Sequence, residues 1–380
     1  MRIVHALAPG PVGGAEQVVA DLTLALRKAG VECHLAAVLD EGDRDHPFLT
    51  LVSSEVAIHP LFVPHRAYGY EYRELRKLFQ SLGPGVVHTH GYRANVVAAA
   101  AARRLDLPVV STAHGFTGRS LKMRLFQALE RWSFRRADAL VAVSRPLGNR
   151  LLRMGAPSAR IHVIGNARSA PAEPMARDDA RAELGVGPDD FVVGWVGRLG
   201  WEKGPDVMVD AARILTTNGV IRNLRITMLG GGESLESLKQ RSRASGCEGS
   251  VSWLGQVQNA ARLFRAFDAM VMSSRSEGTP IVALEAIALD VPLVATDVGG
   301  VVDLTGREAA IIVPPEDPTA LAEAVVDVYL NPEGAVRRVR LAKERIEAHA
   351  SIERWAEAHI DVYEPLHYSG VGTGREIKPD

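Results

Sequence analysis

The stretch Ser276-Glu277-Gly278-Thr279-Pro280-Ile281-Val282-Ala283-Leu284-Glu285-Ala286 decides how the rest of the chain is interpreted. It predicts a helix that begins at Pro280 with Thr279 as its N-cap, because proline suits the first helical position and threonine caps well. The apolar residues of this helix predict that it is buried; they are Ile281, Val282, Leu284 and Ile287. Its free N–H groups and positive dipole end then favour an anion as ligand.

Two carboxylates, Glu277 and Glu285, are separated by seven residues in this stretch. Glu277 precedes the turn and Glu285 lies two turns into the helix, so we expect them to touch different parts of one ligand. The alternative is a loop acid and a solvated helix acid without a common ligand, since glutamate is usually exposed.

Length and composition indicate the class of protein. A chain of 380 residues with 47% hydrophobic content fits two domains of roughly 150 to 200 residues each. The net charge of −1 provides no field that would recruit nucleic acid. Cys33 and Cys247 match no metal or redox spacing, and so few cysteines fit the reducing cytoplasm.

The N-terminal sequence passes directly into a strand and a glycine-rich turn and does not resemble a signal peptide. No apolar run reaches the roughly 18 residues that a membrane span requires. We therefore expect a cytoplasmic protein whose contact with a membrane, if it has any, is peripheral to the inner face.

Short apolar runs alternate with amphipathic segments along the chain, which is typical of parallel sheets covered by helices on both faces. A segment rich in proline and alanine separates two such halves. The predicted organisation is a first domain at 1–168, a linker at 169–188, a second domain at 189–350, a helix at 351–367 that crosses back to the first domain, and a disordered tail at 368–380.

Strands of the first half are predicted near 2–8, 31–38, 55–59, 85–89, 108–113, 138–143 and 160–164, and its helices near 15–29, 71–82, 92–105, 120–136 and 146–154. Strands of the second half are predicted near 191–196, 224–229, 250–253, 268–272, 292–295 and 310–313, and its helices near 203–217, 233–245, 259–266, 280–289, 318–330 and 333–348. Ligands of such folds bind beyond the carboxyl ends of the strands.

The first half offers two features at strand ends. Gly13 and Gly14 follow the first strand and open a helix, which is a way to bring backbone close to a phosphate or a sugar, although a tight turn alone would also explain them. His88, His90 and His114 end later strands. His114, directly before Gly115, is the histidine best placed for a site, although a lone histidine is more often structural.

The segment 119–136 carries six basic residues and one acid, with leucines and Trp132 on one helical face. Such a basic amphipathic helix can lie on an anionic membrane or bind an anionic acceptor. Equally, its apolar face can pack on the sheet and leave the basic face exposed to solvent.

The second half begins with Arg198 and Lys203 in a loop with three glycines after a strand. Two cations beside accessible backbone suit a diphosphate, because arginine can bind oxygens bidentately and lysine adds a point charge. Further strand-end loops contain Gly230 to Gly232, Glu277 to Glu285, and Asp297 to Gly300. Together the four loops indicate a site for a nucleotide diphosphate.

These motifs resemble the retaining glycosyltransferases of family four, which have the GT-B fold of two facing Rossmann-like domains with a C-terminal crossover helix. The resemblance covers about residues 1–367 and rests on Gly13-Gly14, Gly197-Arg198 with Lys203-Gly204, the E-x7-E element from Glu277 to Glu285, and Thr296-Asp297-Val298-Gly299-Gly300. It implies a nucleotide sugar held mainly by the second domain and an acceptor held by the first.

The resemblance also implies roles for single residues. Arg198 and Lys203 would hold the leaving diphosphate, Glu285 the ribose hydroxyls and Glu277 the transferred sugar, with His114 near that sugar; the implied catalytic residues are Glu277, His114, Arg198 and Lys203. The implied donor-binding residues are Gly13, Gly14, Arg198, Lys203, Gly232, Val257, Glu277, Gly278, Thr279, Pro280, Ile281, Val282 and Glu285. Val257 belongs to a base-contacting loop that Gly255-Gln256-Val257 matches only loosely.

Neither a cofactor nor a metal is implied, since the helix end and two cations would replace a metal. The resemblance further implies retention at the anomeric carbon. We favour a front-face path over a covalent adduct on Glu277. One departure from the family is Asn166-Ala167-Arg168-Ser169, where many relatives have Asn-Gly-Val-Asp, and it puts the inherited role of this turn in doubt.

The sequence thus predicts transfer of a sugar from a UDP-sugar, or a GDP-sugar, to a glycan or lipid-linked acceptor in the synthesis of surface polysaccharides or glycoconjugates. Two alternatives stay open. One is a GT-B nucleotide-sugar epimerase or hydrolase that needs no acceptor, and the other is a non-catalytic module that binds nucleotide sugars.

Overall fold

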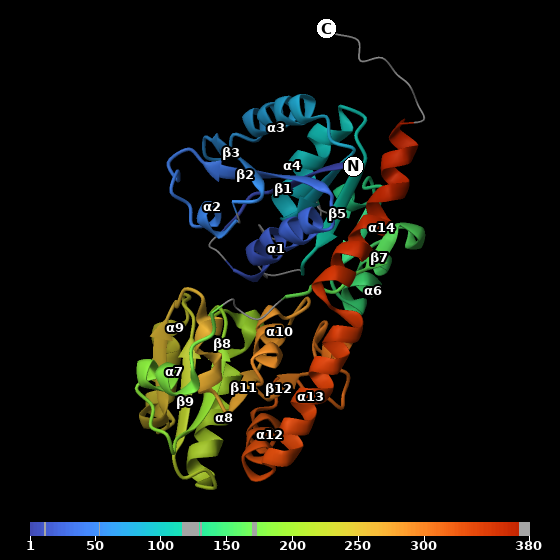
Figure 1. The fold of residues 1–380 in the computed structure, drawn as a ribbon. Helices are drawn as coiled ribbons and strands as arrows, with labels where there is room; N and C mark the ends of the chain where they lie inside the picture. The colour runs from blue at the N-terminus through green and yellow to red at the C-terminus, as the bar shows by residue number, and fades with distance from the viewer. Residues whose placement is uncertain (11–12, 53, 116–128, 130, 169–172, 372–380) are drawn as a thin grey trace. The chain divides into compact units, whose positions relative to one another are not determined.

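A computed structural model describes residues 1–10, 13–52, 54–115, 129, 131–168 and 173–371 (Figure 1). The chain divides into two compact units. The first consists of Met1–Asn166 and Ile352–Asp380, and the second of Ala167–Ser351.

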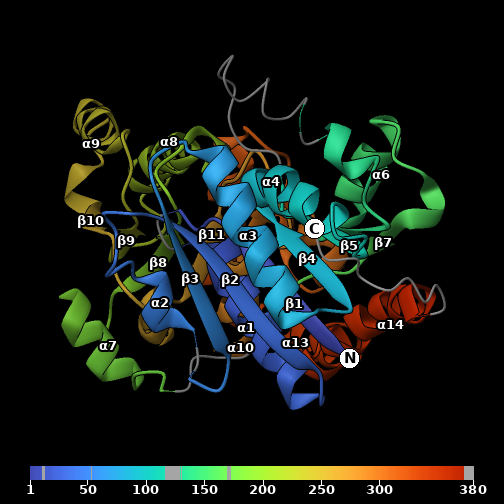
Figure 2. The ribbon, with the colours of Figure 1, turned by 90° about the horizontal axis from the view of Figure 1, so that it is seen from above.

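The described part of the first unit contains a seven-stranded parallel sheet in the order β3-β2-β1-β4-β5-β6-β7. Figure 2 looks onto β3, β2, β1 and β4 side by side. Every residue of β4 and β5 is buried, as expected for central strands covered on both faces. The strands are β1 (Arg2–Leu7), β2 (Glu32–Asp40), β3 (Ala57–Val63), β4 (Val86–His90), β5 (Val109–Ala113), β6 (Ala139–Ala142) and β7 (Ile161–Val163).

Alternate side chains of β1 point to opposite faces of this sheet. Val4 and Ala6 pack with the helices α3 and α4, whereas Leu7 packs with Val19 of α1. The C-terminal helix α14 packs against α1 and β4, and its Tyr363 is buried. The helices are α1 (Gly14–Lys28), α2 (Phe48–Leu51), α3 (Tyr68–Leu82), α4 (Gly91–Arg103), α6 (Arg145–Arg153), the 3-10 helix η1 (Ser158–Arg160) and α14 (Ile352–Val371).

In the part of the second unit that the structure describes, the strands form a six-stranded parallel sheet in the order β10-β9-β8-β11-β12-β13. Val193 and Trp195 of β8 join the core beneath α8 and α12, whereas Val192 joins the core beneath α10 on the other face. The strands are β8 (Phe191–Val196), β9 (Leu224–Leu229), β10 (Val251–Gly255), β11 (Ala269–Met272), β12 (Leu293–Thr296) and β13 (Ile311–Val313).

The helices of the second unit cover both faces of its sheet. They are α7 (Arg177–Leu184), α8 (Pro205–Asn218), α9 (Leu235–Ala244), α10 (Ile281–Ala288), α11 (Val301–Thr305), α12 (Pro318–Leu330) and α13 (Pro332–His349), with the 3-10 helices η2 (Trp201–Lys203), η3 (Glu248–Ser250) and η4 (Ala260–Ala266). The prediction of two α/β domains with parallel sheets is confirmed.

Four local predictions need correction. The segment 169–188 is not only a linker, because α7 forms within it and buries Ala180. Helix α10 begins at Ile281 with Pro280 as N-cap, since ψ of 112° keeps Pro280 outside the helix, and Thr279 is therefore not the cap. The segment near 259–266 forms 3-10 rather than α-helix. Helix α14 continues to Val371, past the predicted start of a disordered tail.

The basic helix predicted at 120–136 lies mostly outside the described residues. Among the residues that are described, no helix is long and apolar enough to cross a membrane.

Candidate active site

Lys203 and Glu277 form the centre of the candidate site in the second unit. Lys203 ends η2, just after β8, and Glu277 lies in the loop between β11 and α10. The Lys203 Nζ is 2.7 and 2.8 Å from the two carboxylate oxygens of Glu277, and the Ser274 hydroxyl donates to Oε1 at 2.6 Å. The Glu277 side chain is 6% exposed, so this nearly buried charge depends on these partners.

Backbone contacts lock the loops at the strand ends together. Gly300 N–H donates to the Gly278 carbonyl at 2.7 Å, and Ser276 N–H donates to the Glu202 carbonyl at 3.2 Å. Gly299 has φ of +56°, and a Cβ there would lie 2.0 Å from the Glu277 carbonyl oxygen. Only glycine allows this approach, so the loop after β12 fixes the backbone that carries Glu277.

Arg275 anchors the loop that carries Lys203. Its guanidinium donates to Asp206 at 2.8 and 2.7 Å, to Glu316 at 2.7 Å and to the Trp201 carbonyl at 3.0 Å. These hydrogen bonds, that of Asp206 above all, raise the pKa of Arg275. Arg275 was not among the site residues predicted from the sequence, although it directly precedes the motif that begins at Ser276.

Glu285 has a partner that the sequence did not predict. Arg168 Nε lies 2.5 Å from Glu285 Oε1, and both side chains are largely buried. Arg168 belongs to the turn that departs from the family pattern, so the available signal was a cation where relatives have a neutral residue. The two residues are 117 positions apart, and only the fold brings them together.

The two predicted phosphate-binding cations lie on one loop but bind different carboxylates. Arg198 is exposed and donates to Glu202 through Nε at 3.1 Å and through Nη2. Lys203 instead binds Glu277. The structure therefore places both cations beside the strand ends, each neutralised by a glutamate in this state.

The remaining predicted residues of the second unit differ in environment. Gly232 has φ of +154° and lies close to the Leu199 backbone. Val257 packs on the hydrophobic core below α10. Glu277, Gly278, Thr279 and Pro280 lead directly into α10, which begins with Ile281 and Val282 and has no side-chain N-cap hydrogen bond. The expectation that this helix end binds an anion stays a prediction.

In the first unit, Gly13 and Gly14 are exposed at the start of α1, and Gly13 N–H donates to Glu16 Oε2 at 3.1 Å. His114 follows β5, and its Nε2 lies 3.2 Å from His90 Nδ1. Burial lowers the pKa of His114 to about 4, so the ring is neutral at neutral pH. His88, His90 and His114 were noted in the sequence at strand ends, whereas His5, which joins them from β1, was not predicted.

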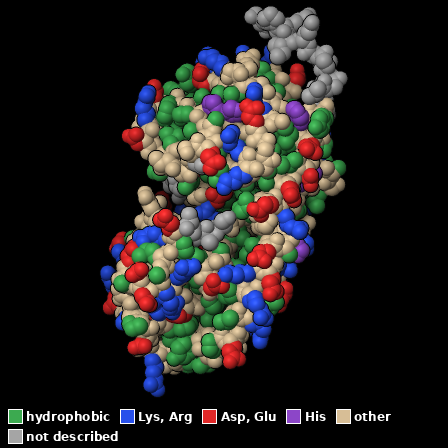
Figure 3. All heavy atoms as spheres, in the orientation of Figure 1, with side chains coloured by type: hydrophobic (Ala, Val, Ile, Leu, Met, Phe, Trp, Pro, Cys, Tyr) green, Lys and Arg blue, Asp and Glu red, His purple; other side chains and the backbone are tan. Residues whose placement is uncertain are grey.

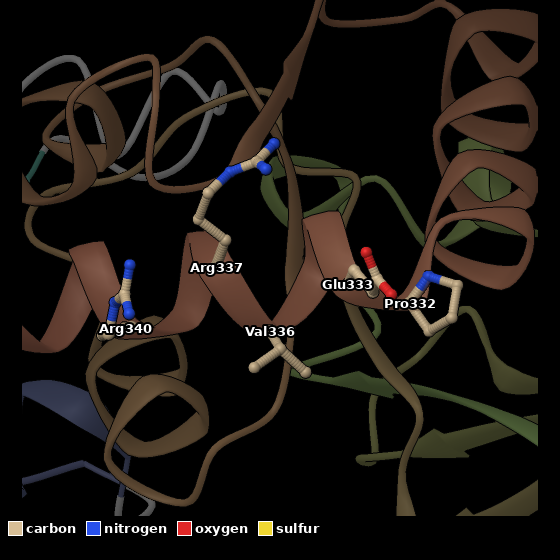
Figure 4. Close-up of a pocket in the computed structure, with 5 residues that line it drawn as sticks. All are labelled: Pro332, Glu333, Val336, Arg337 and Arg340. Carbon is tan, nitrogen blue, oxygen red and sulfur yellow. The ribbon is translucent and has the colours of Figure 1, made fainter.

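A hollow on α13 and the distribution of charged side chains complete the description. A hollow of about 440 Å³ on α13 is lined by Pro332, Glu333, Val336, Arg337 and Arg340. Figure 4 shows Arg337 and Val336 pointing to opposite sides of the helix, so these side chains do not converge on a ligand. On the face drawn in Figure 3, acidic and basic side chains are interspersed, in keeping with the small net charge.

Comparison with known proteins identifies the family. The profile described as Glycosyltransferase Family 4 matches residues 12–168, and that described as Glycosyl transferases group 1 matches residues 176–345. A glycogen synthase of Mycobacterium tuberculosis is 30% identical over 298 residues, covering 75% of this chain and 69% of the relative. A D-inositol 3-phosphate glycosyltransferase of Saccharomonospora viridis is 29% identical over 313 residues, covering 77% and 72%.

Among solved structures, HepE of Anabaena in complex with UDP-glucose superposes with a TM-score of 0.81 at 19% identity, covering 98% of this chain and all of that one. The two α/β units thus have the GT-B fold. The chain belongs to glycosyltransferase family 4, as its motifs predicted, and is a glycosyltransferase.

Proposed function

We propose that this protein transfers a sugar from a nucleotide diphosphate sugar to a glycan or lipid-linked acceptor, with retention at the anomeric carbon and without a metal. The observation that carries the proposal is the Lys203–Glu277 pair, held among the interlocked loops at the strand ends of the second unit. A UDP-sugar is the favoured donor and a GDP-sugar the other candidate. HepE, whose fold this chain has, was crystallised with UDP and with UDP-glucose, which supports UDP.

The reaction breaks the bond between the anomeric carbon and a phosphate oxygen, so the leaving diphosphate gains negative charge. Lys203 and Arg198 compensate this charge, and the N–H groups at the start of α10 add their dipoles. Glu277 holds the transferred sugar and Glu285 the ribose. Because the leaving group is already good once its charge is compensated, positioning contributes more than a strong base.

In the front-face path, the acceptor hydroxyl forms its bond to the anomeric carbon on the face from which the diphosphate departs. The proton of that hydroxyl passes to the leaving phosphate oxygen. Trapping of a glycosyl adduct on Glu277 would overturn this path in favour of a covalent one.

The first experiment is a thermal-shift panel of UDP-, GDP-, ADP- and dTDP-sugars in the presence of a chelator. A ligand at 100 times its dissociation constant stabilises by about 2.7 kcal/mol, which is a readable shift. A thermal shift with the sugars of a single nucleotide supports the donor site and identifies the nucleotide of the donor. A folded protein that responds to none, also when candidate acceptors are added, would contradict the proposal.

Variants then test the site. We expect Glu285→Ala to weaken nucleotide binding, and Lys203→Ala to lower turnover more than it weakens sugar recognition. Lys239→Ala is the matched control, because Lys239 is similarly exposed and pairs with a glutamate on its own helix, α9. Unchanged activity of the Lys203 and Glu285 variants would reject the site. Hydrolysis or epimerisation without acceptor would favour the alternative enzyme, and binding without turnover would favour a binding module.

A further inference from the structure

Three histidines of the first unit form a continuous hydrogen-bonded chain. His5 Nδ1 lies 3.0 Å from His90 Nε2, and His90 Nδ1 lies 3.2 Å from His114 Nε2. The ring planes of His5 and His90 are nearly parallel, at 16° to each other, with 5.3 Å between the ring centroids. His5 and His90 are buried, whereas His114 is only partly buried at the end of β5. The chain therefore connects the core to the edge of the sheet.

The cluster around this chain is built for hydrogen bonds rather than for a metal ion. Nitrogen atoms of His5, His88 and His90 lie within 4.8 Å of one another, as metal ligands would. Yet five of their six ring nitrogens have protein partners, because His88 binds the Tyr363 hydroxyl at 2.6 Å and Thr112 at 2.7 Å. A metal would have to displace these partners.

Each ring in the chain is neutral and carries one N–H and one lone pair. Burial lowers the pKa of His5 to about 3 and that of His114 to about 4, and it lowers the pKa of His90 well below the usual value. At the His5–His90 contact and at the His90–His114 contact, an N–H of one ring must face a lone pair of the other, so the tautomers of the three histidines are coupled. Only two combinations of tautomers satisfy this condition.

The inner end of the chain distinguishes the two arrangements. His5 Nε2 is buried and has no hydrogen-bond partner among the described residues. In one arrangement it would carry an N–H without an acceptor, and in the other it carries only a lone pair. Orphaned buried N–H groups are rarer than under-satisfied acceptors. The favoured arrangement therefore has His5 Nδ1–H donating to His90, and His90 Nδ1–H donating to His114 Nε2.

We propose that His5 and His90 are positioning residues that fix His114 as its Nδ1–H tautomer, so that His114 offers a hydrogen-bond donor and not a base to its ligand. The effect on catalysis rests on the proposed function and on the implication of the family resemblance that His114 acts near the transferred sugar. The effect of His5 and His90 on the tautomer of His114 does not depend on the proposed function.

The test is a long-range proton–nitrogen spectrum of the full chain with ¹⁵N-labelled histidine, in which nitrogens with and without a proton have separate shifts. The His114 signals are assigned from their loss in His114→Gln. We expect Nδ1 to carry the proton in the native protein. In His90→Phe, which leaves His114 Nε2 without its donor, we expect both tautomers. His90→Asn places an amide near the Nδ1 position and should restore the single tautomer.

Tyr363→Phe is the matched control, because it removes a hydrogen bond to His88 from the same buried cluster without touching the chain. It should leave the His114 signals and kcat unchanged. In His90→Phe we expect kcat for transfer to fall roughly tenfold with a smaller change in KM, as for one lost hydrogen bond, and partial recovery in His90→Asn.

A native His114 protonated on Nε2 would overturn the proposal, as would a folded His90→Phe protein whose His114 signals match the native ones. Equal effects of Tyr363→Phe and His90→Phe would mean a general structural role and would also overturn it. If the tautomer changes as expected but no nucleotide sugar is turned over, the proposed function fails and the inference about His114 stands.

Discussion

Acidification should destabilise the first unit far more than the second, because the first unit holds a set of buried or partly buried neutral histidines. Burial lowers the pKa of His5 to about 3 and that of His114 and His359 to about 4, from an ordinary value of 6.5. In the unfolded chain these groups return to the ordinary value. The unfolded state therefore binds more protons between about pH 4 and 6.5, and stability falls as the pH falls through that window.

The size of the effect follows from proton linkage. Between pH 7.5 and 5.5, a histidine that titrates only when unfolded costs about 1.4 kcal/mol, so these three cost about 4 kcal/mol together. His88 and His90, whose pKa values are also lowered well below the ordinary one, add to this loss. A domain has about 5 to 15 kcal/mol of stability in total, so the loss at pH 5.5 is a large fraction of the stability of the first unit.

The assay is hydrogen exchange of the full chain at pH 7.5 and 5.5, corrected for the intrinsic exchange rate at each pH. Peptides from β1 and β4 report the first unit, and peptides from β8 and β9 report the second. The second unit is an internal control, because its only histidine in the sequence, His349, is exposed. Equal losses of protection in both units, or none in the first, would refute the reasoning.

Three further predictions concern the second unit and the basic segment. Gly299→Ala should destabilise the protein by about 2 kcal/mol or more in urea unfolding, because the new Cβ meets the Glu277 carbonyl oxygen. The control Gly219→Ala has a similar positive φ but lies in open space, so it should cost about 1 kcal/mol. Equal costs of the two substitutions would contradict the close contact between the loops. Arg168→Ala removes a largely buried partner of Glu285 and should lower the free energy of unfolding by about 1 to 3 kcal/mol in the same assay. The control Arg262→Ala breaks a more exposed ion pair and should lower it by less than about 1 kcal/mol. The reverse order would reject a role for Arg168 in holding Glu285. Changing Arg131, Arg135 and Arg136 together to glutamate should abolish binding to anionic liposomes if the segment 119–136 contacts membrane, and unchanged binding would reject that contact.

Most of the fold could be predicted from the sequence because its signals are local. Helices and strands follow from the period of the apolar residues, and Leu224–Leu229 and Pro318–Leu330 have the predicted bounds. The α-helices that were missed, α2, α7 and α11, are short and have few apolar positions from which a period could be recognised. Helix α7 was missed because nearby prolines gave its segment the composition of a linker.

The sequence by itself determined the family, the two parallel α/β domains and the loops that hold Lys203, Glu277 and Glu285. Each of these features can be recognised from residues that are contiguous in the sequence. Only the tertiary structure decided the pairings. Arg168 with Glu285, and His5 with His90, are 117 and 85 residues apart. The physical reason is that periodicity and capping act within one element, whereas such contacts depend on strand order and register, as where β1 lies beside β4 and places His5 within reach of His90.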